Sequence, residues 1–276
     1  MTAWSVSGLG VGVIVRVAFL GPEHSFTHMA AEKLFPGAEL VPCNSITKVF
    51  RLVEGYEVDY GVVPVENSLE GPVGETLDNL ATTMLHIYAA LEMRIALVLA
   101  GRKGAGKIYG HPHALREAAR SLERLAPGAE LVPVPSTSHA ARQAAEEDVL
   151  CVCSRRAAEA YSLEIIAEGL EDGPNYTRFI ALAWRDQPEN AERTSIIAAF
   201  PDEPGSLYRF LEPFARHGVN LKMIYSRPIP GKPWHYNFYI DLEGSRLDRH
   251  VAEALEEAAA RSLFIHVLGS YPVQRD

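Results

Sequence analysis

Short apolar runs alternate with amphipathic stretches along the first two thirds of the chain. The apolar runs predict strands at residues 15–20, 60–65, 95–100, 129–133, 149–153 and 179–184. The stretches with helical periodicity predict helices at residues 26–35, 74–86, 112–125, 138–146 and 155–161. Strands that alternate with helices in this way predict an α/β fold with mainly parallel sheets.

Three polar loops border these predicted strands. The loops GPEHS (21–25) and PVENS (64–68) follow strands, and ligands of α/β proteins bind beyond the carboxyl ends of strands. The segment NYTRF (175–179) places a hydroxyl, a guanidinium and an aromatic ring where the chain enters an apolar strand. All three loops are therefore candidate parts of a binding site, although the last could instead cap a strand edge.

The pattern changes after a polar segment, Arg185–Arg193, which we interpret as a linker. Beyond it we expect a strand at 194–200, a helix to about 217, strands at 219–225 and 234–242, a helix at 247–261 and a strand at 263–270. This βαββαβ order within about 80 residues is the ferredoxin-like arrangement. We therefore predict an N-terminal extension at 1–13, one domain at 14–188 and a second at 189–276.

Composition narrows the classes of function. The 276 residues are 47% hydrophobic with a net charge of −9, and no Lys/Arg run exceeds two residues, which argues against nucleic-acid binding. A small anion remains possible, because a few arginines can outweigh the global charge inside a closed cleft. The three cysteines, Cys43, Cys151 and Cys153, favour a reducing, cytoplasmic setting. The apolar N-terminus lacks a basic region, so we expect neither a signal peptide nor a membrane span.

Two other motifs were weighed as cofactor or metal sites. The segment GRKGAGK (101–107) is close to a phosphate-binding loop, but Ile108 stands where that loop needs a hydroxyl. His24 and His28 have the spacing of metal ligands on a helix, but a third histidine is not near in sequence. We therefore expect no metal and no cofactor.

Several motifs, in the same linear order, resemble the prephenate dehydratase family. They are VAFLGPEHSFTHMAA (17–31), YGVVPVENSLEGPVGETLDNL (60–80), GHPHAL (110–115) and NYTRF (175–179). The segments PGSLYRFL (204–211) and NLKMIYSRP (220–228) resemble the phenylalanine-binding motifs of the ACT regulatory domain. The resemblance implies a two-lobed catalytic domain like the type II periplasmic binding proteins, followed by a ferredoxin-like ACT domain.

The resemblance implies conversion of prephenate to phenylpyruvate, water and carbon dioxide, without a cofactor. It assigns Thr177 as the catalytic residue, which we expect to donate a hydrogen bond to the departing hydroxyl because a threonine hydroxyl is a poor acid. The residues that the resemblance places around the substrate are Pro22, Ser25, Glu66, Asn67, Ser68, Gly71, His113, Arg178 and Phe179.

Structural roles for some of these residues remain open. Arg178 alternates with Thr177 along a strand, so the two side chains should point to opposite faces and Arg178 could form a structural salt bridge. Glu66 could pair with an arginine, and Ser25 could cap the helix that follows it.

The resemblance also implies L-phenylalanine as an effector and a homodimer or homotetramer formed through the ACT domain. The residues that it assigns to the effector are Gly205, Ser206, Leu207, Asn220, Leu221, Tyr225, Ser226, Arg227 and Pro228. The chain departs from the family pattern at His24, His113 and Tyr225, where the family usually has Gly, Gln and Glu. Two alternatives stay open: an arogenate dehydratase, and a non-catalytic amino-acid sensor.

Overall fold

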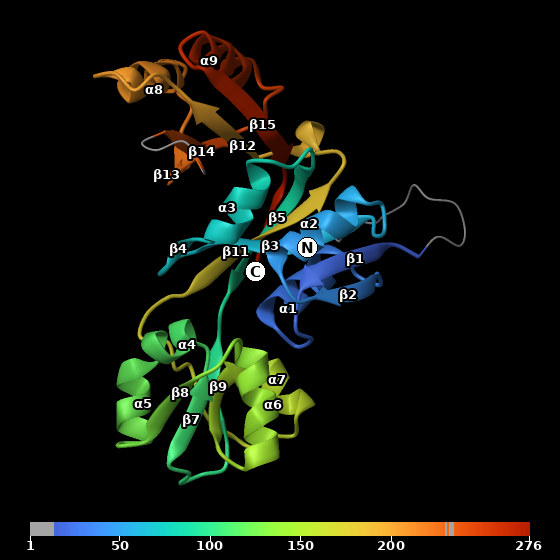
Figure 1. Cartoon of the computed structure of the whole chain (residues 1–276), viewed down its shortest axis with the longest axis vertical. Coiled ribbons are helices and arrows are strands. Elements are labelled where there is room, and N and C mark those ends of the chain that lie inside the picture. Colours follow the sequence, from blue (N-terminus) through green and yellow to red (C-terminus); the bar gives the residue numbers. More distant parts are fainter. Residues whose placement is uncertain (1–13, 230, 232–234) are drawn as a thin grey trace.

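The computed structural model describes residues 14–229, 231 and 235–276 as three parts in a row (Figure 1). The predicted extension at 1–13, and Trp234 at the start of a predicted strand, lie outside the described residues. A first lobe occupies the middle of the row, with a second lobe at one end and the C-terminal domain at the other.

The first lobe is built on a seven-stranded sheet with the order β16-β5-β11-β3-β1-β2, in which β4 pairs with β3. Its strands are β1 (Arg16–Leu20), β2 (Glu39–Cys43), β3 (Tyr60–Asn67), β4 (Gly71–Pro72), β5 (His86–Arg94), β11 (Tyr176–Ala183) and β16 (Val273–Arg275). The helices are α1 (Phe26–Leu34), α2 (Ile46–Glu54) and α3 (Gly74–Leu80). Helix α1 contributes to the apolar core on one face of the sheet, and α2 and α3 contribute to the core on the other.

The second lobe has a five-stranded sheet with the order β10-β6-β9-β7-β8. Its strands are β6 (Leu97–Gly101), β7 (Lys107–Gly110), β8 (Glu130–Pro133), β9 (Leu150–Ser154) and β10 (Ile165–Glu168). The helices are α4 (Pro112–Glu117), α5 (Ala119–Leu125), α6 (Thr137–Glu147) and α7 (Arg155–Ala160). The chain enters this lobe after β5 and leaves it before β11, and the Ile95 N–H donates to the Asn175 carbonyl (2.9 Å) between the two crossings.

Both sheets are mixed, which corrects the expectation of mainly parallel sheets. Strand β1 pairs in parallel with β2 and β3, whereas β11 is antiparallel to both β3 and β5. In the second lobe, β7 is parallel to β8 and β9, but β6 is antiparallel to β9 and β10. The antiparallel pairs arise because β5 carries the chain toward the second lobe and β11 carries it back.

The predicted helix at 74–86 was wrong in its second half, because α3 ends at Leu80 and β5 starts at His86. The segment that follows α3 is rich in Leu, Ala and Met, which favour helices in isolation. Pairing with β11 and burial of its alternate residues override that preference. Strand β2, helix α2 and strands β10 and β16 were also absent from the predicted elements.

The C-terminal domain confirms the predicted βαββαβ order. Its elements are β12 (Arg193–Ala199), α8 (Ser206–Arg216), β13 (Leu221–Pro228), β14 (Tyr236–Glu243), α9 (Arg249–Ala259) and β15 (Phe264–Tyr271). The sheet has the order β13-β14-β12-β15, and buried residues of α8 and α9 share one apolar core with it. A short 3₁₀ turn, Pro188–Asn190, lies in the predicted linker.

The end of the chain returns to the first lobe. Strand β16 pairs in parallel with β5, and the Val273 side chain is buried in the core between the first lobe and the C-terminal domain. Strand β16 lies within the predicted second domain at 189–276, but it belongs to the sheet of the first lobe. In the described part of the chain, no helix is long and apolar enough to cross a membrane.

We expect Val273→Ala to lower the free energy of unfolding by about 2 kcal/mol, because it removes two methyl groups from a buried site. Gln274→Ala, on the next residue of the same strand, should change it by less than about 0.5 kcal/mol. Urea denaturation of both variants measures the difference. Equal effects would show that β16 contributes only its backbone hydrogen bonds.

Candidate active site

A cleft of about 660 Å³ lies between the two lobes. The first lobe lines it with the residues that follow β1 and β2, which include the predicted residues Pro22 and Ser25. The second lobe contributes His111, His139 and the segment between β8 and α6. The loop at 21–25 thus faces the second lobe from the carboxyl end of its strand, as expected for an α/β site.

The N-termini of two helices face each other across this cleft. Ser25 is the N-cap of α1 and accepts from the His28 backbone N–H (3.2 Å), and Ser136 caps α6 in the same way with His139 (3.0 Å). The capping role proposed as an alternative for Ser25 is therefore present, together with a position on the cleft wall. Helix N-termini carry partial positive charge, so the cleft has two places suited to an anion.

Thr177 lies at the start of β11, directly opposite Asn67 at the end of β3. The Asn67 Nδ2 group donates to Thr177 Oγ1 (3.1 Å) and to Asn175 Oδ1 (2.7 Å). The Asn67 Oδ1 atom accepts from the backbone N–H groups of Leu69 (2.8 Å) and Glu70 (3.0 Å). These two bonds fix which end of the Asn67 amide faces Thr177.

The polarity of this cluster leaves the Thr177 proton free. Because Asn67 donates to the Thr177 oxygen, the hydroxyl hydrogen must point elsewhere, and no described side chain or carbonyl accepts it. The side chain is partly exposed. Thr177 can therefore donate a hydrogen bond to a bound molecule. Neither Thr177 nor Asn67 is among the residues that line the cleft of about 660 Å³.

Two predicted residues near Thr177 shape the backbone. Ser68 pairs with Tyr176, since its N–H donates to the Tyr176 carbonyl (2.8 Å) and its Oγ accepts from the Tyr176 N–H (2.9 Å). Gly71 has a φ of +81°, a left-handed conformation that favours glycine, where β3 turns back into β4. Both residues hold the loop that carries Asn67.

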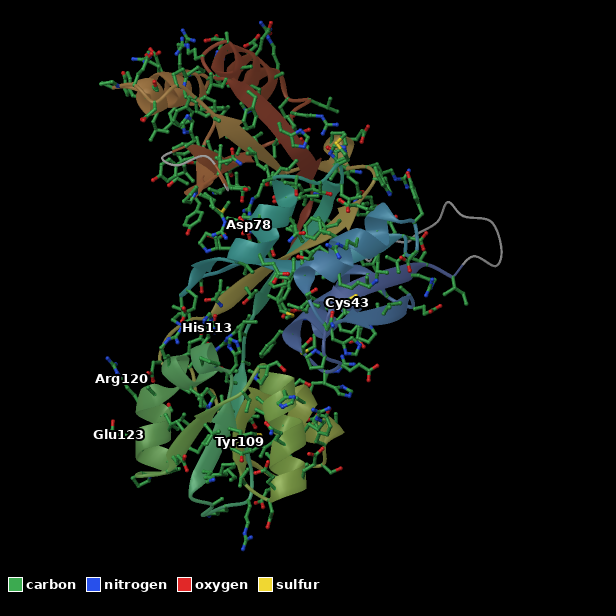
Figure 2. All side chains as sticks on the ribbon, viewed as in Figure 1. Cys43, Asp78, Tyr109, His113, Arg120 and Glu123 are labelled. Atoms are coloured by element: carbon green, nitrogen blue, oxygen red, sulfur yellow. The ribbon has the colours of Figure 1, made fainter. Side chains whose placement is uncertain are left out.

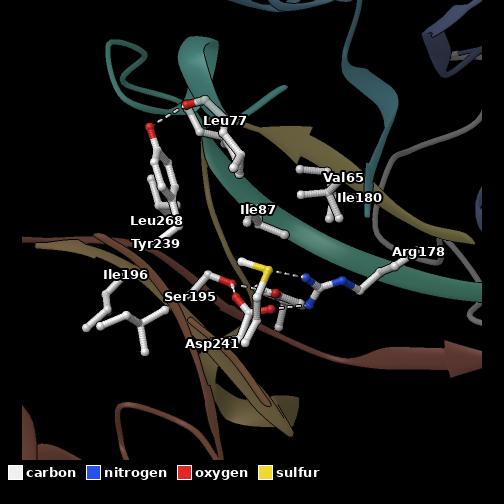
Figure 3. A pocket seen from close by; sticks show the side chains of 14 residues that line it. Val65, Leu77, Ile87, Arg178, Ile180, Ser195, Ile196, Tyr239, Asp241 and Leu268 are labelled. Carbon is white, nitrogen blue, oxygen red and sulfur yellow. Dashed lines mark hydrogen bonds and ion pairs between the residues drawn. The ribbon is translucent and has the colours of Figure 1, made fainter. Parts of the chain in front are cut away.

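Arg178 faces away from Thr177, toward the C-terminal domain (Figure 3). Its side chain is only 6% exposed and pairs with Asp241 on β14 and with Glu66 Oε2 (3.1 Å). Burial opposes its charge, but Asp241, Tyr271 and Glu66 together outweigh burial and raise the pKa of Arg178 above its usual value. The expected substrate contacts of Arg178 and Glu66 are replaced here by the structural ion pair that strand alternation allowed.

Two further predicted residues also lie elsewhere than on the cleft wall. Phe179 is 2% exposed within the core of the first lobe, so it cannot form an open wall against a substrate. His113, on α4 of the second lobe, lies 3.8 Å from Glu70 of the first lobe (Figure 2). Arg116 of the same helix also pairs with Glu70 (2.8 Å), so these side chains tie the two lobes together.

The sequence analysis missed Glu117 at the end of α4. Its Oε2 atom accepts from Asn175 Nδ2 (2.6 Å), and Asn175 in turn accepts from Asn67. Burial, with the negative charges of Glu70 and Glu171, raises the pKa of Glu117 to about 7. Nothing in the local sequence signals this, because the four residues that meet here come from three separate segments.

A second cavity, of about 610 Å³, lies in the C-terminal domain between the start of α8 and the β13–β14 end of the sheet. The predicted effector residues Gly205, Ser206 and Leu207 line it, with a largely apolar remainder that the sequence analysis did not name: Phe200, Ile229, Phe238, Leu263 and Phe264. Gly205 has a φ of +82° at the entry to α8.

The other predicted effector residues lie apart from this cavity. Arg227 forms a paired ion bridge with Asp78 of α3, which ties β13 to the first lobe. Asn220 donates to Glu243 (3.0 Å), and Leu221 packs partly buried against the domain core. Tyr225, Ser226 and Pro228 are exposed on the edge strand β13. Within the described residues, no cluster of three or more potential metal ligands occurs.

The fold and the site define a two-lobed α/β enzyme with an attached ferredoxin-like domain. The family model for prephenate dehydratase matches residues 17–187, and the model for the ACT domain matches residues 195–260. The chain belongs to the prephenate dehydratase family and carries an ACT domain.

Individual relatives agree with this membership. The chain is 41% identical to a bifunctional chorismate mutase/prephenate dehydratase of Aquifex aeolicus, over 94% of this chain and 74% of that protein. It is 35% identical to an arogenate dehydratase/prephenate dehydratase of Arabidopsis thaliana, over 95% of this chain and 74% of that protein. The structure also resembles that of the prephenate dehydratase of Arthrobacter aurescens in complex with L-Phe. The TM-score is 0.84 and the sequence identity is 34%, over 94% of this chain and 90% of that chain.

We expect Asp241→Ala to lower the free energy of unfolding by about 3 kcal/mol, because it leaves Arg178 partly uncompensated in a buried site. Glu256→Ala, at an exposed position on α9, is the control and should have little effect. Guanidinium denaturation of both variants tests this. Wild-type stability in Asp241→Ala would mean that Glu66 alone compensates the guanidinium.

Proposed function

We propose that the chain converts prephenate to phenylpyruvate, water and carbon dioxide. In this reaction the ring carboxylate leaves as carbon dioxide, its bonding electrons aromatise the ring, and the ring C–O bond breaks. The departing oxygen takes up one proton from solvent and leaves as water. The observation that carries the proposal is the Thr177 hydroxyl, whose oxygen accepts from Asn67 and whose hydrogen is free to donate to that departing oxygen.

The cleft suits a dianion without a side chain of full positive charge. One carboxylate would lie at the N-terminus of α1 and the other at the N-terminus of α6, on opposite walls of the cleft. His111 also lines the cleft, but burial and the neighbouring His113 lower its pKa, so the ring is neutral at pH 7. A neutral imidazole can still donate one hydrogen bond to a carboxylate.

L-Phenylalanine is the effector that we propose for the cavity in the ACT domain. Its phenyl ring would pack against Phe200 and Phe238, and its carboxylate would meet the backbone at Gly205 and Ser206. The named complex of a related prephenate dehydratase with L-Phe supports this assignment. Regulation requires that the effector bind two conformations of the protein with different affinity.

We further propose that the protein assembles as a homodimer, or a dimer of such dimers, through the ACT domain. Strand β13 is an edge of its sheet, and apolar side chains such as Ile224 (45% exposed) and Tyr225 (37% exposed) lie along it. An unpaired edge with exposed apolar residues commonly pairs with a second copy.

The two alternatives differ from this proposal in what the cleft does. Arogenate carries an amino group in place of the side-chain keto group of prephenate, so both substrates belong in the same assay. A pure amino-acid sensor would not need the Asn67 bond that frees the Thr177 proton.

We expect Thr177→Ala to lower kcat for prephenate on the order of a hundredfold, because it removes a hydrogen bond to the leaving group. Thr82→Ala, at an exposed threonine after α3, is the control and should retain wild-type activity. Phenylpyruvate formation, followed by its absorbance in alkali, measures both variants. Turnover of arogenate but not prephenate by the wild type would replace the proposed substrate, and turnover of neither by folded protein would favour the sensor.

We expect Leu207→Glu to weaken L-phenylalanine binding at least about tenfold, because it replaces an apolar side chain of the cavity lining with a carboxylate, in a cavity that Asp202 and Glu203 already line. Tyr208→Glu is the matched control, since the neighbouring Tyr208 is 72% exposed and lies outside the described cavity lining. Calorimetric titration measures affinity, and turnover without effector should be unchanged in both variants. Equal binding by the two variants would move the effector away from this cavity.

A further inference from the structure

A chain of side-chain hydrogen bonds joins the two lobes and ends at Thr177. It runs from Glu117 on α4 of the second lobe, through Asn175 and Asn67, to the Thr177 hydroxyl. The heavy-atom distances along it are 2.6, 2.7 and 3.1 Å. Asn67, Asn175 and Thr177 belong to motifs named above, whereas Glu117 does not, and no function has been assigned so far to Glu117 or Asn175.

Each bond in this chain has a fixed direction. Two backbone N–H groups hold the oxygen of Asn67, so its nitrogen must supply hydrogens to both Thr177 and Asn175. The oxygen of Asn175 is thereby occupied, and the nitrogen of this residue, which is 1% exposed, needs an acceptor. Glu117 is that acceptor.

The protonation state of Glu117 decides whether the Asn175 amide must keep this orientation. A carboxylate only accepts hydrogen bonds, so it requires the Asn175 nitrogen to face it. A carboxylic acid can also donate, which allows the Asn175 amide to rotate and present its nitrogen to the nitrogen of Asn67. That rotation would break the bond between Asn175 and Asn67, so that only the Leu69 and Glu70 N–H groups would hold the Asn67 amide against Thr177.

The charges around Glu117 come from several elements. Glu70 approaches from the loop after β3, Glu171 from the segment before β11, and Arg116 from its own helix. Asp172 donates its backbone N–H to the Glu117 carbonyl (2.8 Å). The two carboxylates and burial raise the pKa of Glu117 to about 7, while Arg116 and the bond from Asn175 oppose the rise.

We propose that the Glu117 carboxylate is a positioning residue for the dehydration, which holds Asn175 and Asn67 so that the Thr177 proton points toward the leaving hydroxyl. The proposal rests on the proposed function and deepens it. It assigns no proton transfer to Glu117, because the two amides between it and Thr177 do not carry a proton. In this proposal, the enzyme with an ionised Glu117 is the active form.

The sign of the pH dependence follows from this assignment. Activity is lost as pH falls through the pKa of Glu117, because protonated Glu117 no longer fixes the orientation of Asn175 in the chain of hydrogen bonds. A bound dianion disfavours the nearby carboxylate and raises its pKa further. The acid limb of kcat should therefore lie at higher pH than the acid limb of kcat/KM, which reports the free enzyme.

The kinetic test compares wild type with Glu117→Gln and Glu117→Leu from about pH 5.5 to about pH 9. Glutamine still accepts from Asn175 but does not titrate. We therefore expect kcat within about threefold of wild type at high pH, and no acid limb near pH 7 in the pH profile of kcat. Leucine cannot accept, so kcat should fall on the order of a hundredfold with KM changed less than about threefold. Glu123→Gln, on the outer helix α5, is the matched control (Figure 2) and should keep the wild-type profile.

A wild-type acid limb that persists in Glu117→Gln, or a wild-type kcat in Glu117→Leu, would overturn the proposal. Thermal denaturation and L-phenylalanine binding establish that each variant is folded.

A spectroscopic readout separates this inference from the proposed function. In ¹⁵N spectra, the side-chain NH₂ signals of Asn175 and Asn67 should shift with one midpoint near pH 7 in wild type and stay constant in Glu117→Gln. This result would support the chain of hydrogen bonds from Glu117 to Thr177 even if prephenate were not the substrate. Signals that do not move with pH in wild type would overturn the inference, whatever the turnover.

Discussion

The ion pair between Arg178 and Asp241 is the contact on which the arrangement of the first lobe and the ACT domain depends. It joins β11 of the first lobe to β14 of the ACT domain in a site where the guanidinium is 6% exposed. Ser195 donates to Asp241 (2.5 Å) and bonds to the buried Tyr271 (2.6 Å), so the carboxylate is held from the ACT side as well. Loss of either partner would leave the other charge buried and uncompensated, so this contact strongly stabilises the interface between the first lobe and the ACT domain.

This contact also determines which way Thr177 points. Adjacent side chains alternate across a strand, so an Arg178 that is held against the ACT domain turns Thr177 to the face that meets the second lobe. One strand therefore carries the contact with the ACT domain and the proposed catalytic hydroxyl on its two faces. A change in the ACT sheet that moves Asp241 would reach Thr177 through one residue of backbone.

The sequence and the structure agree where local pattern and family motifs govern. Periodicity predicted the βαββαβ order of the ACT domain, and strand alternation allowed the structural pairing of Arg178. Strand β5 was not predictable, because its Ala- and Leu-rich segment becomes a strand only through pairing with β11 and burial between two cores. Glu117 was not predictable either, since its raised pKa arises from burial and from Glu70 and Glu171, which are far from it in sequence.

The sequence by itself determined the family, the order of the domains and the hydroxyl at Thr177, because ordered motifs and periodicity are properties of the chain. Only the tertiary structure decided which of the motif residues face the cleft, and it sent Arg178, Glu66 and Phe179 elsewhere. It also joined Glu117 and Asn175 to the catalytic cluster and returned β16 to the first sheet. These outcomes depend on contacts between distant segments, and hydrogen-bond direction and burial exist only once those segments meet.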